Sequence, residues 1–205
     1  YKIDEDKCNK YEYNPLLKQF QIDQENTKQL DKPEEWVQTL DWRKIVEPLI
    51  IKPIINPLLV SRVQLQPTEI EIEYLKQWTS VWTSVYDSVG ASVYDLVWTS
   101  VYDSVGASVR NSVWASVRAS VWDSVGASVW YSVGASVRTS VWDSIWAYFS
   151  SFFDIQYKYD FPLAIKLWEA GLVPSFDGRT WQLHAGSKAE IVWKLKSSRG
   201  SRNEK

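Results

Sequence analysis

The chain has 205 residues, with 23 lysines and arginines against 25 aspartates and glutamates, so no excess of positive charge favours nucleic acid or anionic membranes. A single cysteine and a single histidine exclude a disulfide framework and a Cys/His zinc site. No run of about eighteen apolar residues occurs, and residues 1–10 are polar and charged, unlike a secretory leader. The sequence therefore predicts a protein of the cytoplasm, or of a virion or host cytoplasm if a phage encodes it.

Residues 1–76 form a mixed segment with eleven basic and fourteen acidic residues. Pro33, followed by Glu34 and Glu35, predicts a helix start, because proline is tolerated in the first turn and carboxylates favour the positive end of the helix dipole. The strict alternation of glutamate and isoleucine from Glu69 to Glu73 predicts a strand with its three carboxylates exposed. We expect this segment to cap the one that follows.

Residues 80–147 repeat a four-residue unit, Ser-Val-x-x, seventeen times without a gap. Serine leads every unit except the one that begins at Leu96, and valine follows in every unit except the last, which has Ile145. The third position holds Trp, Tyr, Gly or Arg. A unit this short cannot bury an apolar side alone, so the units must stack on their neighbours.

Two structures compete for this repeat. A long α-helix would place the valines one turn apart, but a period of four drifts by about 40° per unit, and few of these residue types favour helices. A β-solenoid would instead stack the fixed residues of very short strands into ladders. Five tryptophans at sixteen-residue spacing fit a square coil of four units: Trp82, Trp98, Trp114, Trp130 and Trp146. We therefore predict a mainly β fold, a short-strand β-solenoid over residues 77–155, with long or broken α-helices as the alternative.

With one apolar residue fixed in each unit, this stretch resembles the pentapeptide-repeat proteins, whose four-sided coils carry one large inward apolar residue per side. The resemblance covers residues 80–147 only. The stretch departs from that family in its period of four and in its use of valine. The resemblance implies a coil with valine inside and the third-position residues outside, and the aromatic cluster at residues 148–153 would close the coil's open end.

Residues 156–205 are predicted to form a small α+β module. Pro162 and Gly171 mark the start and end of a short helix over residues 161–170. Residues 180–184 and 189–193, joined by a loop that contains Gly186, predict an antiparallel hairpin. The stretch 167–178 resembles the carboxy-terminal module of uncharacterised bacterial and phage proteins, which implies no known activity and favours a phage or mobile-element origin.

Outward aromatic side chains predict a binding or assembly surface rather than an enzyme, because a monomer rarely leaves a large apolar patch in water. The equal alternative is that these rings stack on one another along the coil or are covered by residues 1–76. The candidate binding residues are Trp82, Trp98, Trp114, Trp122, Trp130, Arg110, Arg118 and Arg138. Six aspartates against three arginines in residues 79–155 disfavour a nucleic acid. The expected partner is a protein, including a second copy of this chain. No phosphate-binding loop, metal-ligand spacing or nucleophile motif occurs, so neither a cofactor nor a metal is expected.

The alternative function is a small hydrolase-like or carbohydrate-binding protein with its site around Asp177 and His184. As a general base, His184 would need a carboxylate to orient it and a nucleophile in reach, which Asp177 and Ser175 would supply across a turn. On a strand, however, His184 shares the polar side with Gln182, so a surface histidine beside a turn is the simpler expectation.

Overall fold

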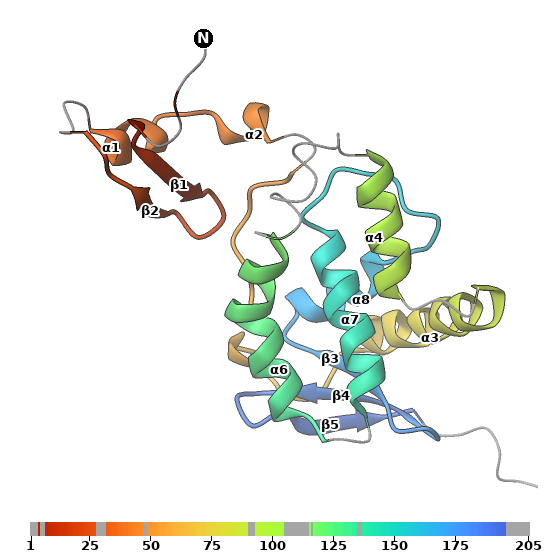
Figure 1. The fold of residues 1–205 in the computed structure, drawn as a ribbon. Helices are drawn as coiled ribbons and strands as arrows, with labels where there is room; N and C mark the ends of the chain where they lie inside the picture. Colours follow the sequence, from red (N-terminus) through yellow and green to blue (C-terminus); the bar gives the residue numbers. More distant parts are fainter. Residues whose placement is uncertain are drawn as a thin grey trace, which may run out of the picture.

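The fold is α+β, with a helical centre between two small antiparallel sheets (Figure 1). A computed structural model describes residues 4, 7–27, 32–46, 49–89, 93–104, 115, 117–134 and 137–195, without the side chains of residues 86–89, 102–104 and 138. Over these residues the Ser-Val-x-x repeat forms helices and not short strands. The prediction of a mainly β fold built on a β-solenoid is therefore wrong, and the repeat takes the broken helices that were the alternative.

The described residues of the N-terminal part include a hairpin and two short helices. Strands β1 (Lys10–Asn14) and β2 (Gln19–Gln24) pair antiparallel, with a bulge between Lys10 and Tyr11. Helices α1 (Pro33–Gln38) and α2 (Trp42–Ile45) follow, and a 3-10 turn, η2 (Pro57–Leu59), precedes the helical centre. The predicted helix start at Pro33 is confirmed, with Glu34 and Glu35 in the first turn.

The helical centre contains α3 (Glu69–Val89), α4 (Val93–Ser104), a π turn η3 (Trp122–Gly126), α6 (Ala127–Ser132) and α7 (Arg138–Ser150). Residues 69–73, predicted as a strand, are the first turns of α3, and Glu71 is buried, so this prediction is wrong. The aromatic cluster at residues 148–153 does not cap a coil. Its rings lie in the core, where Phe152 and Phe153 also meet the segment at Leu49 and Ile50.

A period of four works in these helices because each of them carries only a few units of the repeat, which in α3 begins at Ser80. From Val93 to Val101 in α4 the drift is two steps of about 40°, or about 80°, which is within the width of an ordinary apolar face. The π turn η3 has more residues per turn than an α-helix, so a step of four residues rotates the valine side chains in the direction opposite to the drift in an α-helix. This keeps Val121, Val125 and Val129 on one side. Second-position residues are accordingly buried at Val85, Val93, Val97, Val101, Val117, Val121, Val125, Val129, Val133, Val137, Val141 and Ile145.

The leading serines fit inside helices because their hydroxyls bond to the preceding turn. Ser84 Oγ donates to the Ser80 carbonyl at 2.9 Å, Ser140 Oγ to the Val137 carbonyl at 2.9 Å, and Ser144 Oγ to the Val141 carbonyl at 2.8 Å. Such a bond uses the hydroxyl donor within the helix itself, so buried Ser144 needs no distant acceptor. Packing of the valine face offsets the low helix propensity of these residues, because packing of the apolar face supplies most of the stability of helices in proteins.

The C-terminal module packs onto this helical centre. Helix α8 (Pro162–Glu169) is followed by β3 (Val173–Phe176), β4 (Trp181–Ala185) and β5 (Glu190–Lys194), which form a sheet of order β3-β4-β5. The predicted helix and the predicted hairpin are confirmed. The Tyr148 ring of α7 stacks on the Trp168 ring of α8 at a centroid distance of 5.1 Å, which joins the module to the repeat.

Gly171 ends α8 at a position where an added side chain would be both strained and crowded. Its φ is +80°, and the amides of Gly171 and Leu172 donate to the carbonyls of Trp168 and Leu167, the Schellman pattern of helix ends. A Cβ at Gly171 would lie 3.0 Å from Val60 Cβ and 3.2 Å from the Pro57 carbonyl oxygen. The position therefore requires a positive φ and also lacks space.

We expect Gly171→Ala to lower the free energy of unfolding by about 1–2 kcal/mol more than Gly178→Ala does. Gly178 is a matched control, since its φ of +89° carries the same backbone strain while no atom lies within 4 Å of an added Cβ. Urea denaturation of both variants measures the difference. Equal losses would show that the contact with Val60 has no energetic weight.

Candidate binding site

A cavity of about 410 Å³ lies between η3 and α7, and we call it the tryptophan pocket. Its apolar walls are Val121, Trp122, Trp142, Ile145, Trp146 and Phe149. Arg118, Ala119 and Asp123, all exposed, complete its lining. Ligand-binding cavities are commonly of this size and are lined by aromatic side chains with a few polar groups, so this cavity is the candidate site.

The repeat itself gathers these rings. Trp142 and Trp146 occupy the third position of consecutive units and lie one turn apart on α7, with ring centroids 5.5 Å apart at 71°. Trp122 on η3 meets Trp142 edge to face at 5.2 Å and 68°, and Trp130 on α6 meets Trp142 at 5.5 Å and 73°. Edge-to-face pairs stabilise by about 0.5–1.5 kcal/mol each beyond their burial, so the cluster holds its own shape.

Gly126 allows the Trp122 ring to reach this position. A Cβ at residue 126 would lie 2.5 Å from Trp122 Cε3, closer than two carbon atoms can approach. The third position of this unit therefore has to lack a side chain, while the third position of the preceding unit holds the tryptophan. The alternation of glycine and tryptophan in the repeat thus has a packing reason here.

The charges of the tryptophan pocket are balanced. Arg118 offers donors and Asp123 offers acceptors, and both side chains are exposed beside half-buried Trp122 and Trp142. Among the described residues, the lining contains one side chain of each charge. The site suits a neutral, mainly apolar group that brings its own polar donor and acceptor to the edge.

The structure separates the candidate binding residues that the repeat pattern placed on one surface. Trp122, Trp130 and Arg118 lie at or beside the tryptophan pocket. Trp82 belongs to α3 and Trp98 to α4, and neither lines the cavity. Arg138 begins α7, but its side chain lies outside the described residues, as do Trp114 and Arg110 altogether. The sixteen-residue spacing of the tryptophans therefore does not produce a single column.

Trp82 makes a polar contact that the sequence did not predict. Its Nε1 donates to Asp143 Oδ2 at 2.8 Å, and its ring packs against Phe176 and Trp181 of the C-terminal sheet. Asp143 is buried on α7 and also accepts from the backbone amide of Val93. Burial raises the pKa of Asp143 to about 6, although these two hydrogen bonds act in the opposite direction. A carboxylate is thus held in the core without a cation among the groups that shift its pKa.

His184 and Ser175 do come together, but inside the protein. Ser175 Oγ lies 2.7 Å from His184 Nε2, and His184 Nδ1 lies 2.9 Å from the Ala189 carbonyl oxygen. Because that carbonyl only accepts, Nδ1 carries the proton, and Nε2 accepts from the serine hydroxyl. Ser175 is 0% exposed and His184 is 4% exposed, so the prediction of a surface histidine is wrong. Burial lowers the pKa of His184, which keeps the imidazole neutral.

Asp177 does not orient His184. Its Oδ1 accepts from the amides of Arg179 and Thr180 at 2.9 and 2.7 Å, and Oδ2 accepts from Gln182 Nε2. These bonds close the turn between β3 and β4, as an aspartate before a glycine commonly does. The serine–histidine pair therefore lacks a carboxylate partner and a path to solvent, and the geometry gives the hydrolase alternative no support.

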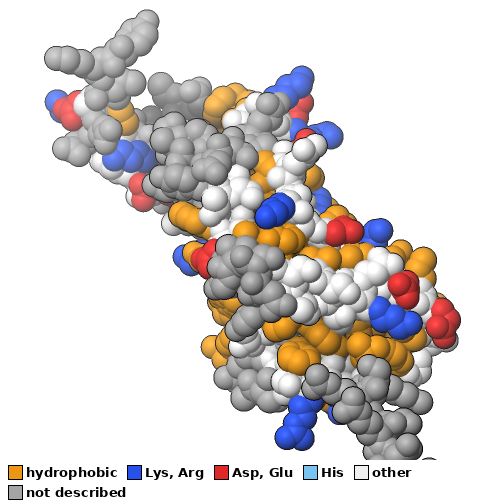
Figure 2. Space-filling model, turned by 90° about the vertical axis from the view of Figure 1, so that its right-hand side faces the viewer, with side chains coloured by type: hydrophobic (Ala, Val, Ile, Leu, Met, Phe, Trp, Pro, Cys, Tyr) orange, Lys and Arg blue, Asp and Glu red, His pale blue; other side chains and the backbone are white. Residues whose placement is uncertain are grey.

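Comparison of the chain with protein-family models, with curated proteins and with solved structures finds no match. The resemblances stated from the sequence therefore remain predictions, apart from the coil, which the helices replace. Within the described part of the chain, no helix is long and apolar enough to cross a membrane, and no three His, Cys, Asp or Glu side chains gather as metal ligands would. Figure 2 shows acidic and basic side chains intermixed on one face, without a patch of a single sign.

Proposed function

We propose that this chain is a binding protein without a catalytic site, and that its tryptophan pocket receives an apolar side chain of a partner protein. The observation that carries the proposal is the cavity of about 410 Å³ walled by Trp122, Trp142 and Trp146. Tryptophan and arginine are the residues most enriched among the energetic centres of protein interfaces. Both are present in this lining.

The polar groups of the pocket favour a polypeptide as the partner. A peptide segment presents a carbonyl acceptor and an amide donor beside each side chain. Arg118 and Asp123 supply the complementary donor and acceptor on the exposed edge of the cavity. An anionic polymer would meet Asp123 as well as Arg118, and the intermixed surface charges in Figure 2 offer it no electrostatic attraction.

The test is selection of peptides on the full chain from a phage library of random dodecapeptides. We expect enriched peptides that contain an aromatic or large aliphatic residue, and we expect Ala119→Trp to weaken their binding by about tenfold or more, because the new indole fills the cavity. Ala119 is exposed, so this variant fills the pocket without truncating the core. Fluorescence polarisation of synthetic copies of these peptides measures the affinity.

Ser132→Trp is the matched control, since Ser132 is exposed on α6 and does not line the pocket. It should bind the selected peptides as the wild type does. Failure to enrich any peptide, or peptides that bind Ala119→Trp as well as wild type, would refute the proposal. A dimer of the wild type that Ala119→Trp dissociates in sedimentation velocity would identify the partner as a second copy of this chain.

A further inference from the structure

Trp36 on helix α1 lies mainly in solvent. It is 62% exposed, whereas every other tryptophan in the described part of the chain is buried or half-buried. The next residue, Val37, is the one that α1 buries. Tryptophan combines a large apolar area with few rotatable bonds, and it is strongly enriched among the energetic centres of protein interfaces. Trp36 is therefore a candidate anchor for association with another molecule.

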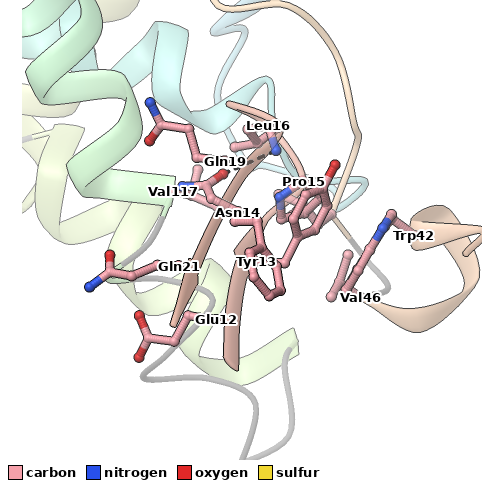
Figure 3. Close-up of a pocket in the computed structure, with 12 residues that line it drawn as sticks. Glu12, Tyr13, Asn14, Pro15, Leu16, Gln19, Gln21, Trp42, Val46 and Val117 are labelled. Atoms are coloured by element: carbon pink, nitrogen blue, oxygen red, sulfur yellow. Dashed lines mark hydrogen bonds between the residues drawn. The ribbon is translucent and has the colours of Figure 1, made fainter. Parts of the chain in front are cut away.

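A series of contacts fixes α1 on the N-terminal hairpin. Trp42 Nε1 on α2 donates to the Val37 carbonyl of α1 at 2.7 Å. The Trp42 ring lies 5.1 Å from the Tyr13 ring of β1, and Figure 3 shows Tyr13 pointing toward Trp42 at this end of the hairpin. Asn14, the next residue of β1, donates from Nδ2 to Ser120 Oγ of the repeat at 2.7 Å. Because α1 is held in a defined place, less entropy is lost when it binds a partner.

The same contacts keep Trp36 away from the tryptophan pocket of its own chain. Figure 1 shows α1 at the outer edge of the N-terminal part, with the β1–β2 hairpin between α1 and the helices α6 and α7. The pocket lies between η3 and α7, and neither α1 nor α2 contributes to its lining. An indole from α1 that enters this pocket must therefore come from a second copy of the chain.

The tryptophan pocket has room for such an indole. Its volume of about 410 Å³ is near the lower end of the range for ligand cavities, which suits one large side chain. Trp122 and Trp142 in its wall are half-buried, so each has surface left for a further ring. These two rings already meet edge to face, and a third indole can make the same kind of contact with them.

The charges beside Trp36 complement those at the edge of the pocket. Lys32 and Glu35 are exposed at the start of α1, where Lys32 Nζ lies 2.6 Å from Glu35 Oε1. The edge of the pocket carries exposed Arg118 and Asp123. When the indole enters, the glutamate can approach the arginine and the lysine can approach the aspartate. Such pairs at the rim of an interface set its orientation more than they add affinity.

We propose that the tryptophan pocket of one copy of this chain receives Trp36 of a second copy. The inference rests on the proposed function of the pocket as a receptor for an apolar side chain, and it identifies the partner. Because the pocket and α1 are different surfaces of the chain, two copies can exchange their anchors reciprocally or several can join head to tail. Both arrangements make the same contact, so the same variants test both.

The test is sedimentation velocity of the full chain over a range of concentrations. We expect the wild type to self-associate. Trp36→Ala removes the anchor and Ala119→Trp fills the cavity, so each should weaken association by about tenfold or more. An equimolar mixture of the two variants should form dimers, because one variant supplies Trp36 and the other supplies an open pocket. Leu59→Ala is the control, since it removes an apolar side chain that is 71% exposed on η2 outside the pocket, and it should associate as the wild type does.

Three results would overturn the inference: a monomeric wild type, an assembly that Trp36→Ala leaves unchanged, or a mixture of the two variants that forms no dimer. Trp36→Ala removes an exposed side chain and should melt at the wild-type temperature. Ala119→Trp tests the same contact from the other side, so the result does not depend on one variant.

Failure of this inference can be told from failure of the proposed function. Library peptides that bind a monomeric wild type would keep the pocket as a site for another protein and would refute self-association. Absence of any peptide that binds Trp36→Ala, whose pocket is open, would refute the proposed function itself.

Discussion

Arg62→Ala is expected to lower the free energy of unfolding by about 3–5 kcal/mol, because it leaves the buried carboxylate of Glu71 without its counter-ion. Arg62 Nη1 and Nη2 donate to the two oxygens of Glu71 at 2.8 and 2.9 Å, and both side chains are about nine-tenths buried. Arg62 also donates to the carbonyl of Ala170 at the end of α8. The pair thus joins the loop before α3, the start of α3 and the end of α8, and urea denaturation measures its loss.

Glu71 is held ionised by its surroundings. Burial alone would raise its pKa, but hydrogen bonds from Arg62 and from the Thr68 amide at 2.7 Å keep that pKa below its usual value. The control for Arg62→Ala is Lys76→Ala. Lys76 pairs with Glu73 at 3.6 Å, and both of these side chains are about half exposed, so the loss should be below about 1 kcal/mol. Equal losses in the two variants would contradict the structural role of the buried pair.

Asp143→Asn is expected to stabilise the protein at pH 7.5 by about 3 kcal/mol relative to its effect at pH 4. The folded pKa of Asp143 is about 6, above the value near 4 of an unfolded aspartate, so folding takes up a proton between these two values. The stability contributed by the wild-type group is therefore complete below about pH 4 and is lost as the pH rises through 6. The amide keeps an acceptor for Trp82 Nε1 and carries no charge to bury.

The measurement is chemical denaturation of wild type and Asp143→Asn at pH 4, 5, 6 and 7.5. Taking the difference between the two proteins at each pH cancels the titration of groups that they share. Asp154→Asn serves as the control, because it makes the same substitution at an exposed aspartate instead of a buried one. If the difference in free energy of unfolding between wild type and Asp143→Asn did not change with pH, the pKa of Asp143 would not be raised by folding.

Three elements outside the repeat, α1, α8 and the β4–β5 hairpin, were predicted correctly because their signals are local. Pro33 and Pro162 each fix the first turn of a helix, and Gly171 supplies the positive φ that ends one. A glycine loop between two alternating segments specifies the β4–β5 hairpin. Each of these features is decided within a few residues, so no knowledge of distant contacts is needed.

The repeat was predicted wrongly because helix drift was applied to all of its residues at once. The drift rules out one uninterrupted helix, but α4 and α7 have only 12 and 13 residues, and each helix begins with a new phase. The alternation of Glu69 to Glu73 failed for a related reason. Five residues are too few to establish a period, and residues i and i+4 share a face in a helix as well as in a strand, so the long helix that includes them determines the outcome.

Only part of the candidate site was visible in the sequence. The third-position pattern identified Trp122 and Trp130 as candidate residues. Which tryptophan rings contact one another depends on how η3, α6 and α7 pack, and the sequence of a single unit does not indicate this packing. Trp142 and Trp146, four residues apart, would have signalled a shared helix face. The burial of Ser175 and His184 depends on the whole sheet packing on α7, so strand alternation alone placed His184 on the wrong side.

The uniform second-position valines have a consequence for how this chain finds its fold. Sliding one of its helices lengthwise by four residues replaces each valine with the next, so apolar packing alone distinguishes poorly between the two alignments. One polar contact does differ. Trp82 Nε1 donates to Asp143 Oδ2, and a slide of α7 by four residues would replace this carboxylate with Thr139 or Ala147, whereas the serines that bond to Asn14 and to the Phe176 amide recur from unit to unit. This one bond therefore favours a single alignment among near-equivalent ones, as one buried asparagine does in a coiled coil.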